Sequence, residues 1–430
     1  MSAVMDFLTV FSQPQLLLLV GLGTFAGVYV GAIPGLSVTM AVSILISFTF
    51  SWDVYPAISL MIGIYMGGVY GGSRTAILLN IPGAPSAIAT ALDGYPMARR
   101  GEAGEAIGVT TVMSFIGGFI GIGVLALAAP LVSDFALTFQ PRDYMLLAIL
   151  GILLVGSLSQ GSLVKGIFAG ALGIAIGAVG RDPLTFAERF TFDFQVLEGG
   201  ISFIAVMIGM FALNEIMMFY GSRVEERHVP VTAKDSVFLK APGHIKTYWR
   251  NVLRGGSLGT LIGALPGAGA DIAAWIAYAL GKSRSKEKEK YGTGHIEGIV
   301  DATSANNFGI SGAWVPALVF GIPGDTITAI VIGVLYMKGM NPGPTIFMNG
   351  GGQVYALFTV FFVANLIMLP IGYLAIRASK VFILTPRKIL MPVILSFCIV
   401  GAFAINNSIT DIWIMLIIGL VAFVLARNDF

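Results

Sequence analysis

Residues 263–267 read Gly-Ala-Leu-Pro-Gly, in the middle of the apolar stretch 255–280. Proline lacks the N–H that a helix needs and glycine adopts positive φ, so a Pro-Gly pair inside an apolar stretch predicts a broken helix. The preceding loop, 221–254, holds seven Lys and Arg residues, and the following run, 282–290, holds five. Because Lys and Arg stay on the cytoplasmic side, both flanks should lie inside. We therefore expect 255–280 to be a re-entrant hairpin with the Pro-Gly pair at its tip.

The same order of motifs occurs twice along the chain. G-A-I-P-G at 31–35 precedes N-I-P-G at 80–83, and G-A-L-P-G at 263–267 precedes G-I-P-G at 321–324. The two prolines are 48 residues apart in the first half and 57 in the second. The distribution of Lys and Arg orients the two copies in opposite directions across the membrane. Inverted repeats interrupted by Gly and Pro predict a secondary transporter that binds its substrate between the repeats near the bilayer midplane.

Composition supports a chain that lives in a lipid bilayer. Hydrophobic residues make up 56% of its 430 residues and charged residues only 11%, whereas soluble domains carry about 25% charged residues. The net charge of +2 gives no attraction to nucleic acid, and a single cysteine, Cys398, excludes an internal disulfide framework. We predict an all-α polytopic membrane protein with inverted repeats, re-entrant hairpins and broken helices, in roughly ten to twelve membrane segments.

The motifs divide the chain into a first inverted repeat (1–220), a cytoplasmic basic linker (221–254) and a second inverted repeat (255–430). Four simple spans follow the broken crossing in the first half, but only three follow it in the second. We therefore expect the second repeat to lack its last span. The seven simple spans are predicted at 105–133, 143–160, 163–180, 196–220, 349–376, 385–406 and 410–426.

Broken helices expose backbone groups that can bind a ligand. The free N–H groups at a half-helix N-terminus carry partial positive charge and suit a carboxylate, while freed carbonyl groups suit Na⁺. Substrate contacts are therefore predicted at the breaks and beside them, at Pro34, Gly35, Leu36, Ser37, Asn80, Pro82, Gly83, Ser86, Pro266, Gly267, Ala268, Gly269, Pro323, Gly324, Asp325 and Thr326.

Ionisable and amide side chains near the breaks add further candidates. Arg74 would face either a substrate carboxylate or an internal acid. Asp271 and Asp325 are either ligands of a coupling ion or caps of the half-helices that follow them. The possible Na⁺ ligands are Thr39, Asp271, Asn306 and Asn307. The coupling ion is expected to be Na⁺ or H⁺, and no cofactor is predicted.

With these motifs, the chain resembles the large membrane subunit of the tripartite tricarboxylate transporters, the TctA family. The matching stretches lie between residues 21 and 345 and read GAIPGLSVTMA, YGGSRTAILLNIPGAPS followed by LDGYPMARRGEAGEA, GALPGAGADIAAWIAYA, and GIPGDTITAIVIGVLYMKGMNPGP. The resemblance implies that the four Pro-Gly pairs and Asn306-Asn307 are site residues. One departure is Asp301, where the family usually has Glu before its Asn pair.

The resemblance also implies a setting and partners. It implies a multi-pass permease of the bacterial inner membrane, driven by an ion gradient. Its expected partners are a small membrane subunit and a periplasmic binding protein that delivers carboxylated substrates such as citrate.

Two other function classes are alternatives to a carrier. An anion channel or other membrane pore would need a continuous polar lining, and single-channel currents would reveal it. An intramembrane enzyme would need a catalytic motif, but the chain contains neither H-E-x-x-H nor G-x-S-x-G. We therefore predict that the chain is not an enzyme.

Overall fold

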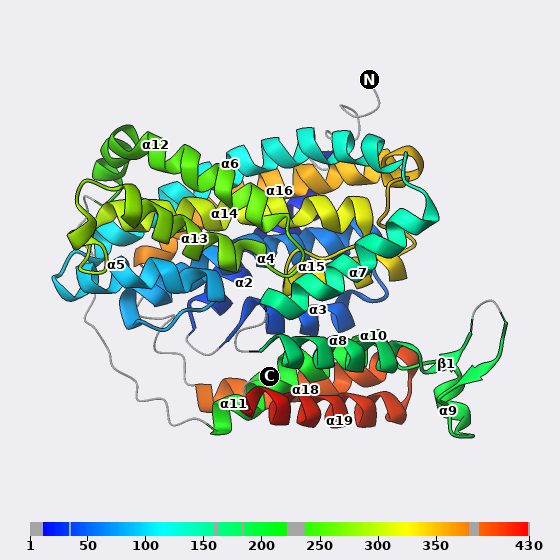
Figure 1. Ribbon diagram of the computed structural model, residues 1–430. Helices are drawn as coiled ribbons and strands as arrows, with labels where there is room; N and C mark the ends of the chain where they lie inside the picture. The colour runs from blue at the N-terminus through cyan, green and yellow to red at the C-terminus, as the bar shows by residue number, and fades with distance from the viewer. Residues whose placement is uncertain are drawn as a thin grey trace. The chain divides into compact units, whose positions relative to one another are not determined.

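The computed structural model describes residues 12–33, 36–158, 162–182, 185–221, 237–377 and 387–428. These segments are almost entirely helical (Figure 1). The strands β1 (Gly180–Arg181) and β2 (Glu188–Arg189) form the only sheet within the described residues, a short antiparallel pair. The predicted all-α, polytopic membrane fold is confirmed.

Six helical segments of the described chain are long and apolar enough to cross a bilayer, judged by length and composition. Shorter apolar helices accompany them, among them the ones beside the breaks. The predicted total of ten to twelve membrane segments therefore stays a prediction. The six candidates are Pro14–Gly31, Val54–Leu79, Ala103–Ala136, Phe203–Tyr220, Gly351–Ala375 and Ile409–Arg427.

Every predicted break falls between two helices. In the first half, α2 (Pro14–Gly31) and α3 (Val38–Thr49) border the first break, and α4 (Val54–Leu79) is separated by the second from the 3-10 helix η1 (Pro85–Ala87) and α5 (Ile88–Arg99). In the second half, the same order is given by α12 (Val237–Gly263), α13 (Gly269–Arg284), α14 (Ile296–Phe320) and α15 (Thr326–Met337). A short 3-10 helix, η3 (Lys288–Lys290), lies between α13 and α14.

The remaining helices correspond to the predicted simple spans. The span predicted at 163–180 ends earlier, at Gly177. The one predicted at 196–220 begins later, at Phe203, after the separate short helix α9, and it includes the π-helix η2. These helices are α6 (Ala103–Ala136), α7 (Pro141–Leu158), α8 (Leu163–Gly177), α9 (Gln195–Glu198), α10 (Phe203–Met207), η2 (Ile208–Leu213), α11 (Asn214–Gly221), α16 (Ile346–Arg377), α18 (Arg387–Asn406) and α19 (Ile409–Arg427).

The chain packs as two compact units, and each draws on both halves of the sequence. Unit 1 comprises Met1–Val42, Trp52–Phe139 and Val224–Thr385, and it contains all four breaks. Unit 2 comprises Ser43–Ser51, Gln140–Arg223 and Pro386–Phe430. Because this division reflects packing and not internal similarity, the predicted repeat boundaries stay a prediction.

Glycines let the long helices of unit 1 approach each other closely, and they do so in the same way in both halves. A Cβ at Gly27 would lie 2.4 Å from the Ile64 carbonyl oxygen, and one at Gly259 would lie 2.4 Å from the Ala305 carbonyl oxygen. Small residues commonly allow such backbone contact between membrane helices. The glycines recur every four residues up to each break, at Gly23, Gly27 and Gly31 in α2 and at Gly255, Gly259 and Gly263 in α12.

The backbone at the broken crossings is also alike in the two halves. α4 ends at Asn80 (φ 56°) and α14 at Gly321 (φ 66°), both in the left-handed region that closes many helices. Three residues later, Gly83 packs on the last turn of α2 and Gly324 on the last turn of α12, so that a Cβ there would lie 2.2 Å and 2.8 Å from the respective carbonyl oxygens. The break in α4–α5 therefore packs directly on the end of α2, and the break in α14–α15 packs directly on the end of α12.

Candidate functional site

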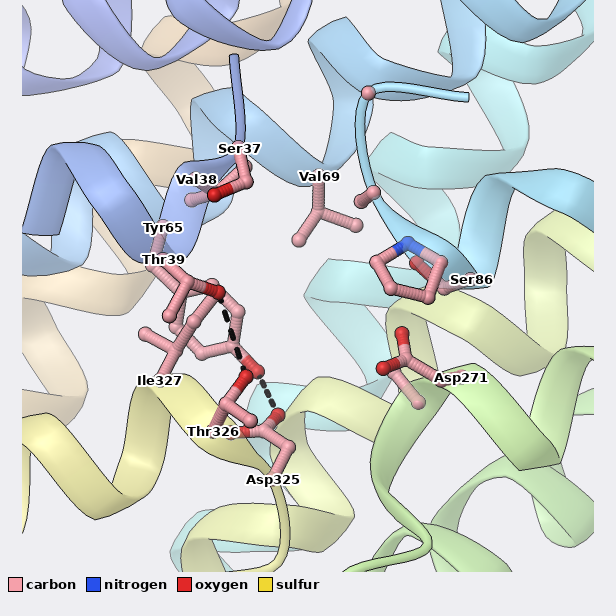
Figure 2. Close-up of a pocket in the computed structure, with 14 residues that line it drawn as sticks. Ser37, Val38, Thr39, Tyr65, Val69, Ser86, Asp271, Asp325, Thr326 and Ile327 are labelled. Atoms are coloured by element: carbon pink, nitrogen blue, oxygen red, sulfur yellow. Dashed lines mark hydrogen bonds between the residues drawn. The ribbon is translucent and has the colours of Figure 1, made fainter. Parts of the chain in front are cut away.

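One pocket in unit 1 gathers residues from all four breaks (Figure 2). Its empty volume is about 370 Å³ with the open mouth included. The lining residues are Ser37, Val38 and Thr39 at the start of α3; Tyr65 and Val69 of α4; Gly83, Ala84, Pro85 and Ser86 at the second break; Ala270 and Asp271 of α13; and Asp325, Thr326 and Ile327 at the start of α15.

The structure brings seven of the predicted site residues together in this pocket. They are Ser37, Thr39, Gly83, Ser86, Asp271, Asp325 and Thr326. Pro34 and Gly35 lie outside the described residues. Among the residues that the structure describes, the other predicted ones do not line the pocket, namely Leu36, Arg74, Asn80, Pro82, Pro266, Gly267, Ala268, Gly269, Asn306, Asn307, Pro323 and Gly324.

Several of these non-lining residues shape the breaks that carry the lining ones. Gly267 (φ 77°) and Gly269 (φ 53°) turn the chain between α12 and α13 with a left-handed backbone that favours glycine. A Cβ at Gly269 would also lie 2.7 Å from the Asp325 Cβ atom. The turn of the hairpin is therefore pressed directly against the fourth break.

Asp325 is held firmly at the start of α15. Its carboxylate accepts a hydrogen bond from the Thr328 backbone N–H at 2.7 Å, and the Thr328 hydroxyl completes a capping box with the Asp325 backbone N–H. The other carboxylate oxygen accepts a hydrogen bond from the Tyr65 hydroxyl of α4. Asp325 is thus a helix cap, and both of its carboxylate oxygens have partners.

Asp271 is arranged differently, although it lies in the first turn of α13. Its carboxylate points into the pocket toward Ser86 (Figure 2), and it is close enough to Asp325 for the two charges to interact. No Lys, Arg or His is among the lining residues that the structure describes. Two carboxylates with no basic partner therefore face the same small space.

Hydroxyl groups complete the polar lining. The Thr39 and Thr326 hydroxyl oxygens are 3.4 Å apart, which joins the first break to the fourth (Figure 2). Ser37 accepts a hydrogen bond from the Met40 backbone N–H at 3.1 Å and so caps α3. With Ser86 and Tyr65, the pocket is lined by five hydroxyl groups whose oxygens can bind a cation. The Tyr65 hydroxyl already donates its hydrogen to Asp325.

Arg74 lies away from the pocket and is only 2% exposed. Its Nη2 donates to the Ala375 carbonyl oxygen, near the end of α16, at 2.6 Å. Its Nε and Nη1 have no hydrogen-bond partner, and no acid pairs with Arg74 among the described residues. Its placement gives no support to either predicted role, contact with substrate or with an internal acid.

The predicted Na⁺ ligands are not all in one place. Thr39 and Asp271 line the pocket, whereas Asn306 and Asn307 are buried on α14. The Asn307 amide donates to the Ser114 hydroxyl of α6 at 3.0 Å, so this side chain is turned toward α6. Both polar atoms of the Asn306 amide are buried without a partner, an arrangement that suits an ion or water and is costly otherwise.

Sequence reasoning missed Val38, Tyr65, Val69, Ala84, Pro85, Ala270 and Ile327. A signal for Tyr65 was nevertheless present. When Pro82 is aligned with Pro323, an offset of 241 residues, Tyr65 falls on the position of Asn306. The repeat therefore places a polar side chain at the same level of α4 and α14.

Comparisons with known proteins agree with the geometry. The family model of the tripartite tricarboxylate transporter TctA family matches residues 17–430. An Agrobacterium vitis protein described as "Uncharacterized 52.8 kDa protein in TAR-I ttuC' 3'region" is 33% identical over 405 residues, which is 94% of this chain and 80% of that protein. A second, "Uncharacterized protein in TAR-II ttuC' 3'region", is 29% identical over 169 residues, 39% of this chain and 70% of that protein. No solved structure matches. The chain belongs to the TctA family and is a multi-pass membrane component of a tripartite tricarboxylate transporter.

Proposed function

We propose that this chain is the permease that carries small carboxylates across the bacterial inner membrane, driven by a cation gradient. The observation that supports this most strongly is the meeting of all four breaks in one pocket of about 370 Å³. Convergence of unwound backbone from two repeats is the arrangement expected of a secondary transporter. A continuous pore would not need two hairpins that end at a shared pocket.

The charge of the pocket explains why a cation should travel with the substrate. At an effective dielectric constant of 20, two like charges about 4 Å apart repel by about 4 kcal/mol, roughly a thousandfold in affinity. A carboxylated substrate entering beside Asp271 and Asp325 would meet such repulsion, and the lining has no basic side chain to offset it. A bound Na⁺, or a proton on Asp271, removes the conflict.

The lining residues divide between these two ligands. Asp271 and Thr39 are proposed as oxygen ligands of the coupling cation, with Asn306 as a further candidate because its amide lacks a partner. Asp325 is less suited to exchange ions, because Thr328 and Tyr65 already occupy its oxygens. The hydroxyl groups of Ser37, Ser86 and Thr326 are proposed to donate to the substrate carboxylates.

Two partners belong to the proposal through the family. A small membrane subunit completes the complex in the inner membrane, and a periplasmic binding protein delivers the substrate. The substrates proposed are di- and tricarboxylates such as citrate.

Uptake of labelled di- and tricarboxylates into proteoliposomes tests this function. The vesicles contain this chain with the small subunit, a matched binding protein is added outside, and a Na⁺ or H⁺ gradient is imposed. We expect uptake that requires one of the two gradients. It should fall about tenfold or more in Asp271→Asn but be retained in Glu289→Gln, which alters an exposed carboxylate of η3. Uptake in the parent that ignores both gradients, or unitary currents through the parent, would refute the proposal.

A further inference from the structure

A fully buried carboxylate outside the pocket joins the two halves of the chain. Asp93 of α5 is 0% exposed and accepts a hydrogen bond from the Tyr278 hydroxyl of α13 at 2.8 Å. Its other oxygen accepts hydrogen bonds from the backbone N–H groups of Gly292, Gly294 and His295 at 2.8–2.9 Å. All four donors belong to the second half of the chain, whereas Asp93 belongs to the first. These hydrogen bonds therefore join the two halves.

This contact lies on two of the elements that line the pocket, further along each of them. Ser86, just before α5, and Asp271, in the first turn of α13, both line the pocket. Asp93 and Tyr278 each follow these residues by seven positions, which is about 10 Å along a helix. The bond between Asp93 and Tyr278 therefore ties α5 to α13 about two turns beyond the pocket.

The segment 285–295, which we call the strap, connects α13 to α14 and covers the bond between Asp93 and Tyr278. Arg100, next to the end of α5, donates to the Thr293 carbonyl oxygen and, at 2.7 Å, to the Gly294 carbonyl oxygen. Tyr291 of the strap donates to Asp301 of α14 at 2.8 Å. The strap is thus attached to its own half by Tyr291 and to the first half by Asp93 and Arg100.

We propose that Asp93, Tyr278 and the strap form a gate that closes the pocket on the side of Arg99 and Arg100. This inference rests on the proposed transport function. A buried carboxylate is unstable without hydrogen-bond donors. The hydrogen bonds of Asp93 therefore break only when water can replace the protein donors, and water reaches Asp93 when the gate opens. At the offset of 241 that aligns the two halves, Val334 stands in the place of Asp93. The buried carboxylate of α5 therefore has no counterpart at the equivalent position of α15.

Cysteine labelling tests the gate without a transport assay. In a Cys398→Ala background, Thr90→Cys places a thiol on α5 between Ser86 and Asp93, at a position that is 0% exposed. A membrane-impermeant maleimide is applied to each face of sealed vesicles in turn. We expect Tyr278→Phe to raise the labelling rate from the Arg99–Arg100 face about tenfold, because one buried hydrogen bond is lost, and Asp93→Asn to raise it further.

Tyr291→Phe is the matched control. It also removes one tyrosine hydroxyl from a buried aspartate, but within the second half, so the bond between Tyr278 of α13 and Asp93 of α5 is kept. We expect its labelling rate to stay within twofold of the parent. The gate is refuted if folded Tyr278→Phe protein labels like the parent, or if Tyr291→Phe labels as fast as Tyr278→Phe. Because the parent's transport is measured separately, failure of the gate remains distinguishable from failure of the proposed function.

Discussion

The two broken crossings share a backbone but not a chemistry. The first runs from α4 through Asn80 and Gly83 into α5, and the second from α14 through Gly321 and Gly324 into α15. After the second break, Asp325 and Thr328 cap the new helix with a capping box. After the first, neither η1 nor α5 has a side-chain cap, and Asp271 from the other half faces its start instead.

This difference separates the structural from the exchangeable parts of the pocket. The close backbone packing is common to both repeats and keeps the chain non-helical at the breaks. The carboxylate at the second break is committed to its own helix, whereas Asp271 reaches across to the other repeat. We therefore assign ligand exchange to the side of Ser86 and Asp271, an asymmetry that variants of the two breaks can test.

The shared packing should be the most sensitive feature. Gly83→Ala and Gly324→Ala should each cost about 3 kcal/mol or more, because the added Cβ would overlap neighbouring backbone atoms. The folded fraction after heating in detergent measures this. Gly123→Ala is the control, since a Cβ there meets nothing within 4 Å. Strong destabilisation by only one of the two glycine variants would show that the backbone packing is not equivalent in the two repeats.

The two pocket carboxylates should differ in transport. Asp271→Asn should lower ion-driven uptake about 10- to 100-fold, because the coupling cation loses a charged oxygen ligand. Asp325→Asn should lower it only about threefold, because the asparagine oxygen still caps the helix and its NH2 group can donate to the Tyr65 hydroxyl oxygen, which replaces the bond that is lost. Equal losses in the two variants would contradict the assignment of exchange to Asp271.

The two half-helix starts should differ in stability. Asp325→Ala should destabilise the protein by about 1–2 kcal/mol, because a capping box is removed. Ser86→Ala should cost no more than about 1 kcal/mol, because the Ser86 hydroxyl bonds Asp271 but caps neither η1 nor α5. Thermal unfolding in detergent measures both, and a larger loss in Ser86→Ala would reverse the comparison.

The smallest effect is expected at the helix ends before the breaks. Asn80→Ala should cost about 1 kcal/mol, because alanine is disfavoured in the left-handed region, while Asn80→Gly should stay within about 0.5 kcal/mol of the parent. Gly321→Ala should resemble Asn80→Ala. The same unfolding assay compares them, and a strongly destabilised Asn80→Gly would show that the asparagine side chain matters for another reason.

The breaks could be predicted from sequence because Pro and Gly act locally. Pro82 and Pro323, each followed by glycine, stand just after helices that end at Leu79 and Phe320, so these two helix ends could be predicted. Pro316, which no glycine follows, stays inside α14. For Tyr65, the alignment with Asn306 indicated only a polar position on α4. Its bond to Asp325 depends on which face α4 turns to α15, which the sequence does not show. For the same reason, the direction of Asn307 toward α6 and the burial of Arg74 against α16 required the tertiary structure.

The central claim is that one pocket receives unwound backbone from both repeats, and a disulfide cross-link tests it most directly. In a Cys398→Ala background, Thr39→Cys and Thr326→Cys replace hydroxyl groups whose oxygens are 3.4 Å apart. We predict rapid disulfide formation under mild oxidation in native membranes, slowed when citrate and the coupling cation fill the pocket. A folded double-cysteine protein that forms no cross-link would contradict the account.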